Sequence, residues 1–211
     1  MGNRSAFVLG AVVGLSLLCA GGSAQAESII KRPGAHPHYA VELEPHFVFQ
    51  WANRWGRDDG IGLGLRANVN IVDDGFIKKI NDSVAIGFGL DVTFNDDSCG
   101  WFWYRNDPRF RDNFKCSVTE FWFPVVMQWN FWLTDVISVF GEPGLAFAHR
   151  RWSYEWYCNT GAGTQVCDYD DTDNDLEPVF WGGARFMFSE SIGATVRVGT
   201  PYVSAGINFL L

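Results

Sequence analysis

The chain has 211 residues, with 24 acidic and 16 basic side chains and a formal net charge of −8 at pH 7. This charge disfavours nucleic acid as a partner, because nucleic-acid binding depends on Lys and Arg at the phosphates. Aromatic residues make up 16% of the chain and charged residues only 19%, a balance that favours a protein solvated partly by lipid over a soluble secreted domain.

Residues 1–26 have the organisation of a secretory signal peptide. Arg4 supplies a positive start, a short apolar core follows, and Ala26 closes an A-x-A cleavage site. We therefore expect export, with residues 27–37 as a periplasmic lead-in. The sequence His36-Pro37-His38 could bind a metal, but its place beside the mature amino terminus favours a flexible segment, and we predict no metal and no cofactor.

A strict period of two runs through residues 60–71, GIGLGLRANVNI. The odd positions are apolar, whereas the even positions are Gly, Arg or Asn. A nucleotide-binding loop spaces its glycines G-x-G-x-x-G and opens a helix, so this alternation instead indicates a strand with two unlike faces. The same period predicts eight strands, over residues 38–51, 60–71, 83–95, 118–133, 136–148, 177–188, 191–199 and 202–211.

The connections between these strands alternate in length. Residues 96–117 and 149–176 are long, whereas Thr134-Asp135 and Ser189-Glu190 are tight turns. Long loops at one end and short turns at the other are typical of a meandering membrane barrel, and most of the strands have the length that a tilted strand needs to cross a bilayer. The predicted fold is therefore all-β, an eight-stranded antiparallel up-and-down transmembrane β-barrel over residues 38–211.

The composition of the two strand faces predicts which one points inward. The polar face is rich in Gly, Ser and Asn, and no predicted strand contains Lys. Small residues fit the crowded interior of a narrow barrel, whereas bulky apolar residues can face lipid. Aromatic residues also gather near the strand ends, where interfacial girdles lie. We therefore expect the apolar face to be the outer one.

The chain resembles the small eight-stranded outer-membrane β-barrels of Gram-negative bacteria, the OmpA/OmpX-like group, over essentially all of residues 38–211. The resemblance lies in the alternation, the strand count and the closing strand YVSAGINFLL, which is similar to that group's carboxy-terminal assembly signal. It implies a non-enzymatic protein of the cell outer membrane, with extracellular loops and periplasmic termini. The implied partners are outer-membrane lipid, the barrel-assembly machinery during insertion and an unidentified surface ligand.

Three prolines fall inside predicted strands, at Pro45, Pro124 and Pro143. Proline has no amide hydrogen, so it cannot donate a hydrogen bond to a β-ladder. We therefore expect a β-bulge at each of these positions.

Four cysteines follow the signal peptide, two in each long connection. None lies in a C-x-x-C pair of the kind that binds zinc or haem. In an oxidising periplasm we expect a structural role, with local disulfides Cys99–Cys116 and Cys158–Cys167. Four cysteines allow three pairings, which leaves a loop-to-loop arrangement open.

Aromatic and Arg residues gather in the same two connections. Such residues are common in binding surfaces for glycans, lipid head groups and proteins. They could also complete the interfacial aromatic belt or pack the loops together, and this is the interpretation that we prefer. The candidate binding surface consists of Trp101, Trp103, Tyr104, Arg105, Trp152 and Trp156.

The segment 168–175, DYDDTDND, resembles a D-x-D-x-D calcium loop. It lacks the required Gly, because Leu176 follows Asp175, and no Glu stands at the distance needed for bidentate binding. We therefore expect a solvated acidic loop, and leave open whether it binds calcium.

Groups suited to catalysis are sparse. His149 and Ser153 lie near the predicted outer rim, where lipid-modifying enzymes of this fold class place their catalytic residues, but no acid is clearly placed to orient the histidine. We therefore predict no catalytic residues and no enzymatic activity. A lipid-modifying hydrolase is one alternative, and a secreted lipocalin-like carrier with an apolar cavity is another.

Charged residues on the predicted inward face form the last candidate site. Eight strands enclose a lumen that side chains can fill, and charges held away from water must pair. Laying the strands antiparallel brings Glu44 near Arg66, and Glu142 within reach of Arg185 or Arg197. We predict an ionic plug without a stable pore, formed by Glu42, Glu44, Arg66, Asp91, Glu120, Glu142, Arg185 and Arg197.

Overall fold

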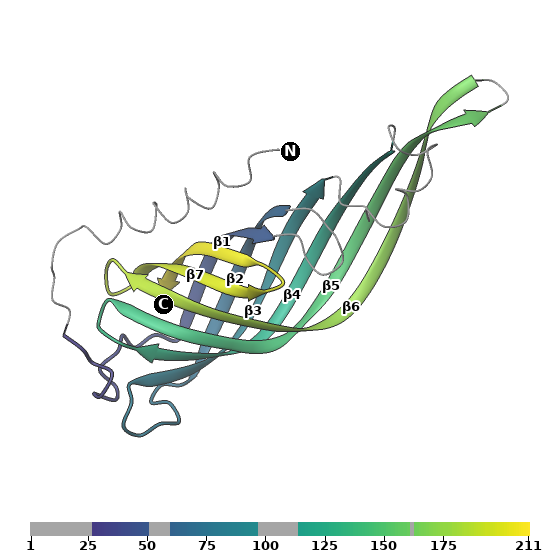
Figure 1. Cartoon of the computed structure of the whole chain (residues 1–211). Coiled ribbons are helices and arrows are strands. Elements are labelled where there is room, and N and C mark those ends of the chain that lie inside the picture. Colours follow the sequence, from purple (N-terminus) through teal and green to yellow (C-terminus); the bar gives the residue numbers. More distant parts are fainter. Residues whose placement is uncertain (1–26, 51–59, 97–113, 161–162) are drawn as a thin grey trace, which may run out of the picture.

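The computed structural model describes residues 27–50, 60–96, 114–160 and 163–211. Their strands form a closed barrel in which each strand pairs antiparallel with the next and the last pairs with the first (Figure 1). The strands are β1 (Val41–Gln50), β2 (Gly60–Val72), β3 (Asp82–Asp96), β4 (Phe114–Trp132), β5 (Ile137–Thr160), β6 (Gly163–Met187), β7 (Ile192–Thr200) and β8 (Val203–Leu210). The predicted all-β, eight-stranded up-and-down topology is confirmed. No helix among the described residues is long and apolar enough to cross a membrane.

Each strand places alternate side chains inside and outside the barrel. In β1, Glu42 and Glu44 are buried in the lumen, whereas Phe47 and Phe49 are 62% and 50% exposed. Antiparallel pairing preserves this arrangement around the ring, because it sets inward residues opposite one another, as with Glu44 and Arg66. The barrel therefore has an apolar outer surface and a polar interior, the reverse of a soluble barrel.

The prolines sit in their strands without bulges. At Pro45, Pro124 and Pro143 one neighbouring ladder is continuous, and the other omits the proline and the residue before it and then resumes in the same register. The expected bulges are therefore wrong, because the strand loses pairing on one side without gaining an extra residue. A register shift occurs instead in the ladder between β2 and β3, between Asn70 and Val72 of β2.

Three strands are much longer than the rest. β4, β5 and β6 have 19, 24 and 25 residues, whereas β7 and β8 have 9 and 8. β5 and β6 pair from Ile137 and Phe186 to Thr160 and Gly163, and Figure 1 shows them running on together past the other strands. Within the segment 149–176, which we predicted as a long loop, residues 149–160 and 163–176 therefore continue the two strands.

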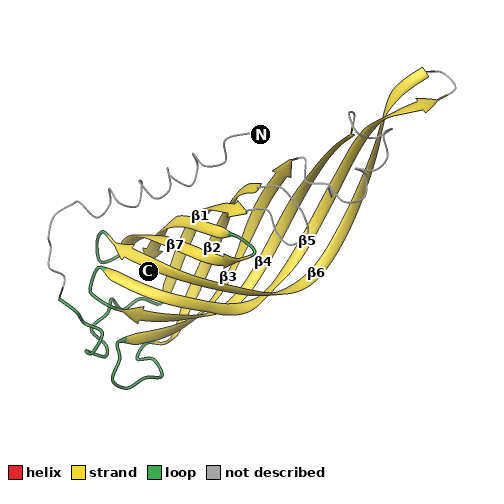
Figure 2. Cartoon of the chain, viewed as in Figure 1, coloured by secondary structure: helices red, strands yellow, loops and turns green. Residues whose placement is uncertain are grey.

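The opposite end of the barrel carries the short connections 73–81, 133–136 and 188–191 and is called the short-turn end (Figure 2). Residues 27–40 lie against it through hydrogen bonds from the Ile29 amide to the Leu133 carbonyl (3.0 Å) and from the Asn81 amide to the Ile30 carbonyl (2.8 Å). The segment that we expected to be a flexible lead-in is thus packed onto the barrel. A buried apolar cluster holds it there, formed by Ile29, Tyr39, Trp132, Met187 and Leu210.

Candidate functional site

The outer face of the long strands changes chemistry along its length. Near the barrel its side chains are exposed and apolar, as at Phe123 and Leu176. Phe121, His149 and Asn174 form one cross-strand row, and beyond this row the outward side chains are mostly polar, with Tyr157 and Val166 as exceptions. We call the part beyond the row the projecting sheet; it comprises residues 114–120 of β4, 150–160 of β5 and 163–173 of β6.

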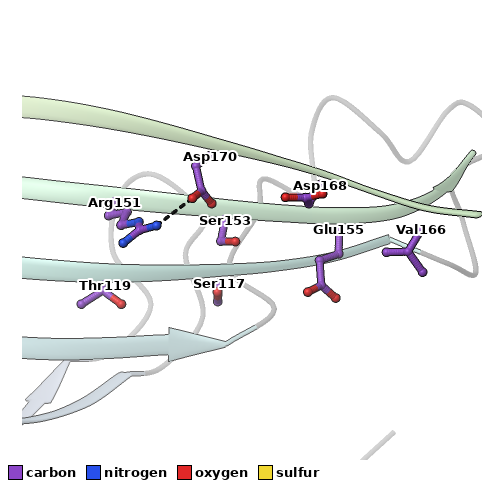
Figure 3. Close-up of a pocket in the computed structure, with 8 residues that line it drawn as sticks. All are labelled: Ser117, Thr119, Arg151, Ser153, Glu155, Val166, Asp168 and Asp170. Atoms are coloured by element: carbon purple, nitrogen blue, oxygen red, sulfur yellow. Dashed lines mark hydrogen bonds and ion pairs between the residues drawn. The ribbon is translucent and has the colours of Figure 1, made fainter.

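A hollow of about 460 Å³ lies on the outer face of the projecting sheet (Figure 3). Across it, Arg151 Nη2 donates a hydrogen bond to Asp170 Oδ2 at 2.7 Å. This bond and a second one with Ser153 hold the pKa of the exposed Asp170 carboxyl below its usual range. The lining has more carboxylates than cations, so it suits a cationic partner; its residues are Ser117, Thr119, Arg151, Ser153, Glu155, Val166, Asp168 and Asp170.

The inner face of the projecting sheet carries aromatic rings. Trp152 stacks on Tyr154 with the ring centroids 6.4 Å apart and the planes at 10°, and Tyr154 meets Tyr169 of β6 at 6.1 Å. Trp156 follows at the next inward position of β5. Trp152 and Trp156 of the predicted binding surface therefore share one face of a strand. The predicted residues Trp101, Trp103, Tyr104 and Arg105 lie outside the described residues.

Arg150 is buried where the projecting sheet joins the barrel. Its Nη1 donates a hydrogen bond to Asp175 Oδ2 at 2.8 Å, and its Nη2 donates one to Glu177. Its guanidinium carbon lies 5.1 Å from the centroid of the Trp122 ring, close enough for a cation–π interaction. Arg150 thus links the acidic part of β6 to the aromatic end of the barrel interior.

The acidic segment 168–175 belongs to β6, so the prediction of a loop is wrong. A strand points successive side chains to opposite faces. Asp170 accordingly pairs with Arg151 on the outer face, and Asp175 pairs with Arg150 on the inner face. Carboxylates divided between two faces cannot converge on one ion in the way that a calcium-binding loop requires.

Charged side chains fill the lumen of the barrel. Arg66 Nη2 lies 3.2 Å from Asp91 Oδ2, and its Nη1 lies 3.1 Å from Glu142 Oε2. The Arg66 guanidinium carbon is also 4.8 Å from the centroid of the Trp181 ring. Every residue of the predicted plug is at most 1% exposed, namely Glu42, Glu44, Arg66, Asp91, Glu120, Glu142, Arg185 and Arg197.

Two further arginines complete this network. Arg197 Nε lies 2.9 Å from Glu142 Oε2, and Arg197 also pairs with Glu44. Arg185 Nε donates a hydrogen bond to Glu42 Oε1 at 3.0 Å. Because Glu142 pairs with both Arg66 and Arg197, the network crosses the lumen from one side to the other.

The structure replaces one predicted ion pair. Glu44 and Arg66 are direct cross-strand neighbours, as we expected, but Glu44 pairs with Arg197, and Arg66 pairs with Asp91 and Glu142. In a narrow lumen a long side chain reaches strands on the far side as easily as the adjacent strand. Backbone register therefore does not determine which charges meet.

Histidine, tyrosine and glutamine side chains that we did not single out also belong to this site. His46 Nε2 lies 2.8 Å from Asp91 Oδ1, Tyr202 donates a hydrogen bond to Asp91, and Gln128 donates one to Glu142 at 2.7 Å. The strand period would have found His46 and Gln128, because both occupy inward positions. It would also have found Tyr202, the first residue of the predicted strand 202–211 and on the same face as Ser204; in the structure Tyr202 lies just before β8.

The cysteines are only partly described. Cys116 lies on β4, and Cys99 lies outside the described residues. In the β5–β6 ladder Cys158 is opposite Gln165, and Cys167 is opposite Trp156. Cys158 and Cys167 therefore stand at diagonal positions of neighbouring strands, and the two predicted disulfides stay predictions.

The two residues considered for catalysis do not meet. His149 Nδ1 lies 2.7 Å from the side-chain oxygen of Asn174, which is an amide and not an acid. Ser153 is four residues farther along β5, roughly 13 Å away for an extended strand. His149 therefore cannot take a proton directly from the Ser153 hydroxyl.

No protein-family model matches the chain, and no curated protein matches it. Among solved structures, the chain is similar to Ail, the attachment invasion locus protein of Yersinia pestis, with 8% sequence identity, a TM-score of 0.44, and coverage of 80% of this chain and 96% of that one. It is also similar to the N-terminal β-barrel domain of Pseudomonas aeruginosa OprF, with 12% identity, a TM-score of 0.41, and coverage of 82% and 98%. These similarities concern the barrel fold alone.

Proposed function

We propose that the chain is a non-enzymatic protein of the Gram-negative outer membrane, whose projecting sheet contacts a ligand or partner at the cell surface. The observation that carries this proposal is the inverted barrel, with an apolar outside and a charged inside. Ile61, Leu63 and Phe47 are 67%, 59% and 62% exposed. The area of exposed apolar surface around a whole barrel is far larger than the apolar patches of a soluble monomer. Lipid would cover such a surface.

The height of the apolar surface supports a bilayer as its partner. β1, β7 and β8 have 10, 9 and 8 residues, close to the 9–11 residues of a tilted membrane-spanning strand. On the long strands, the apolar outer face ends at the row formed by Phe121, His149 and Asn174. The projecting sheet would therefore stand in water, outside the hydrocarbon layer.

The short-turn end would face the periplasm and the projecting sheet the outside of the cell. Outer-membrane barrels generally have short periplasmic turns and longer extracellular connections. In this orientation the described amino-terminal segment and the carboxy terminus are periplasmic, after removal of residues 1–26 as a signal peptide. The expected partners are outer-membrane lipid around the barrel and the barrel-assembly machinery during insertion.

The projecting sheet supports a role in adhesion or ligand contact. Its outer hollow presents carboxylates beside Arg151, and its inner face presents the rings of Trp152, Tyr154 and Tyr169. Rigid aromatic rings on paired strands bury a large area with little loss of conformational entropy. Local disulfides Cys99–Cys116 and Cys158–Cys167, formed while the chain is in the oxidising periplasm, would brace this end of the barrel.

The two alternative functions fit the described residues less well. A lipocalin-like carrier needs an apolar cavity, whereas the lumen here contains the ion pairs of Arg66, Arg185 and Arg197. A lipid-modifying hydrolase needs a base oriented toward a nucleophile, and His149 is bound instead to Asn174.

Cell fractionation followed by gel electrophoresis tests the membrane assignment. We expect the protein in the outer-membrane fraction, with faster migration unheated than boiled, because a closed barrel resists unfolding by detergent. A protein that is monodisperse in detergent-free buffer would overturn the assignment.

Surface labelling tests the orientation. Ser153→Cys, in the projecting sheet, should react with a membrane-impermeant maleimide on intact cells. The matched variant Ser189→Cys, in a turn of the short-turn end, should react only after lysis. The opposite pattern would show that the barrel is inserted the other way.

A further inference from the structure

We propose that His36, His38 and Asp73 form a binding site for Zn²⁺ or a similar divalent transition ion at the short-turn end. One potential ligand atom from each residue lies within 4.8 Å of the other two. His36 Nε2 is 3.4 Å from Asp73 Oδ1, and His38 Nδ1 is 2.6 Å from Asp73 Oδ2. These residues come from two segments, the amino-terminal segment and the β2–β3 connection, which the fold brings together.

His36 is held ready to bind a metal. Its side chain is fully buried, and its ring stacks on Trp132 with centroids 5.8 Å apart and planes at 13°. Nδ1 lies 2.7 Å from the Asn81 side-chain oxygen and can donate a hydrogen bond to it, an arrangement that would leave the Nε2 lone pair for a metal. Metal-binding histidines are commonly oriented by such a second hydrogen bond.

The Asp73 carboxylate faces both histidines. His36 Nε2 lies 3.4 Å from Asp73 Oδ1 and His38 Nδ1 lies 2.6 Å from Asp73 Oδ2, and either a proton on the ring or a bound cation makes such a contact attractive. Asn70 Nδ2 donates a hydrogen bond to Asp73 Oδ1 at 2.9 Å and so steadies the carboxylate.

The separation of His36 from Asp73 fits tetrahedral coordination, and His38 must move to join it. Zn²⁺ binds imidazole nitrogen and carboxylate oxygen at about 2.0–2.2 Å, which places tetrahedral ligand atoms about 3.4 Å apart. The His36–Asp73 separation of 3.4 Å already has this value. The His38–Asp73 separation of 2.6 Å must lengthen, and the His38 side chain, which is 66% exposed, has room to turn.

The ligand set indicates which ions would bind. Two imidazoles and one carboxylate suit Zn²⁺ and neighbouring transition ions, whereas Ca²⁺ and Mg²⁺ prefer oxygen ligands throughout. Three protein ligands leave a fourth position for water. Two surface hollows, of about 450 and 520 Å³, both include His38 in their lining and give solvent access to that position. A bound ion would tie the amino-terminal segment to the β2–β3 connection.

Zinc titration of the chelator-treated mature protein, folded in detergent and followed by calorimetry, tests the site. We expect one ion per chain in the wild type, and at least tenfold weaker binding in both His38→Ala and Asp73→Asn. His149→Ala is the matched control, since it removes a histidine at the other end of the barrel, and its affinity should equal that of the wild type. Heat-shifted gel mobility establishes that each variant is folded.

Two results would overturn the proposal. One is the absence of zinc binding by the folded wild type, which would mean that a proton and not a metal joins His36 to Asp73. The other is unchanged binding in His38→Ala and Asp73→Asn, which would place the ion elsewhere.

Amide hydrogen exchange gives a readout that does not depend on affinity. Zinc should slow exchange in residues 30–40 of the wild type, because the ion would fix this segment to Asp73, and should leave exchange in Asp73→Asn unchanged. Equal exchange in the wild type with and without zinc would contradict the proposed cross-link.

Discussion

Arg66 shows how strongly a single buried charge is tied to its surroundings. It pairs with carboxylates from two other strands, Asp91 of β3 and Glu142 of β5, at 3.2 and 3.1 Å. Taking such ions out of water costs several kcal/mol each, and only pairing and hydrogen bonding offset that cost. Removing the arginine would leave both carboxylates buried with one cation fewer.

We therefore expect Arg66→Met to destabilise the folded barrel by about 3–5 kcal/mol. Arg151→Met is the control, because Arg151 also pairs with a carboxylate but its side chain is 61% exposed; its cost should be about 0–1 kcal/mol. Urea unfolding in lipid vesicles, followed by tryptophan fluorescence, measures both. Equal and small effects would mean that the lumen charges are solvated.

The pKa of Asp170 provides a second test at this scale. Hydrogen bonds with Arg151 and Ser153 lower the pKa of its carboxyl in the folded state. The interaction therefore stabilises the folded state at pH values above the pKa of the unfolded state. This stabilisation is lost as the pH falls through the pKa of the folded state. In Arg151→Gln, a carbon-detected NMR titration should show the Asp170 pKa rising toward the ordinary value for aspartate. An unchanged pKa would show that Arg151 does not set it.

At the scale of the strands, the period of two predicted the barrel but not the length of β5 and β6. It located the strands wherever one face meets lipid, because only there do apolar and polar residues alternate. In residues 150–157, RRWSYEWY, the alternation continues with aromatic residues against polar ones, a signal that we read as loop. In 168–175 both faces are polar, so no pattern exists and only pairing with β5 makes the segment a strand.

The same limit applies to the sites. The inward positions of the lumen charges follow from the strand period, whereas their partners depend on side chains that reach across the lumen, as Glu44 does to Arg197. The packing of residues 27–40 onto the short-turn end depends on contacts between distant segments. Ile29 and Trp132 meet there without any signal in either local sequence.

The β5–β6 ladder makes the cysteine prediction testable at this scale. Diagonal positions on neighbouring strands lie about 7–8 Å apart, more than a disulfide spans, so a Cys158–Cys167 bond needs a local adjustment of the β5–β6 ladder. We expect non-reducing peptide mapping of the mature protein to give Cys158–Cys167 and Cys99–Cys116. A Cys99–Cys158 peptide, or four free thiols, would show that the local pairing is wrong.

Considered as a whole, the barrel is filled in three layers along its axis. At the long-strand end a buried cluster includes Trp122, Trp181 and Tyr202. The ion pairs of Arg66 and Arg197 lie next, and the cluster around Trp132, with the amino-terminal segment, closes the short-turn end. Each layer can span the lumen, because the interior of an eight-stranded barrel is only wide enough to hold side chains.

This layering predicts that the pure protein does not form a stable pore. In planar-bilayer recordings the wild type should give no large, steady single-channel conductance, because an ion would have to pass both aromatic layers and displace paired charges. A double variant, Arg66→Ala with Glu142→Ala, removes a pair whose atoms meet at 3.1 Å in the middle layer and should leave the barrel closed, since the outer layers remain. Adding Trp181→Ala and Trp132→Ala, one residue from each outer layer, to that background should produce measurable openings. Steady conductance in the wild type would refute the plug, and a closed quadruple variant would show that other side chains block the lumen.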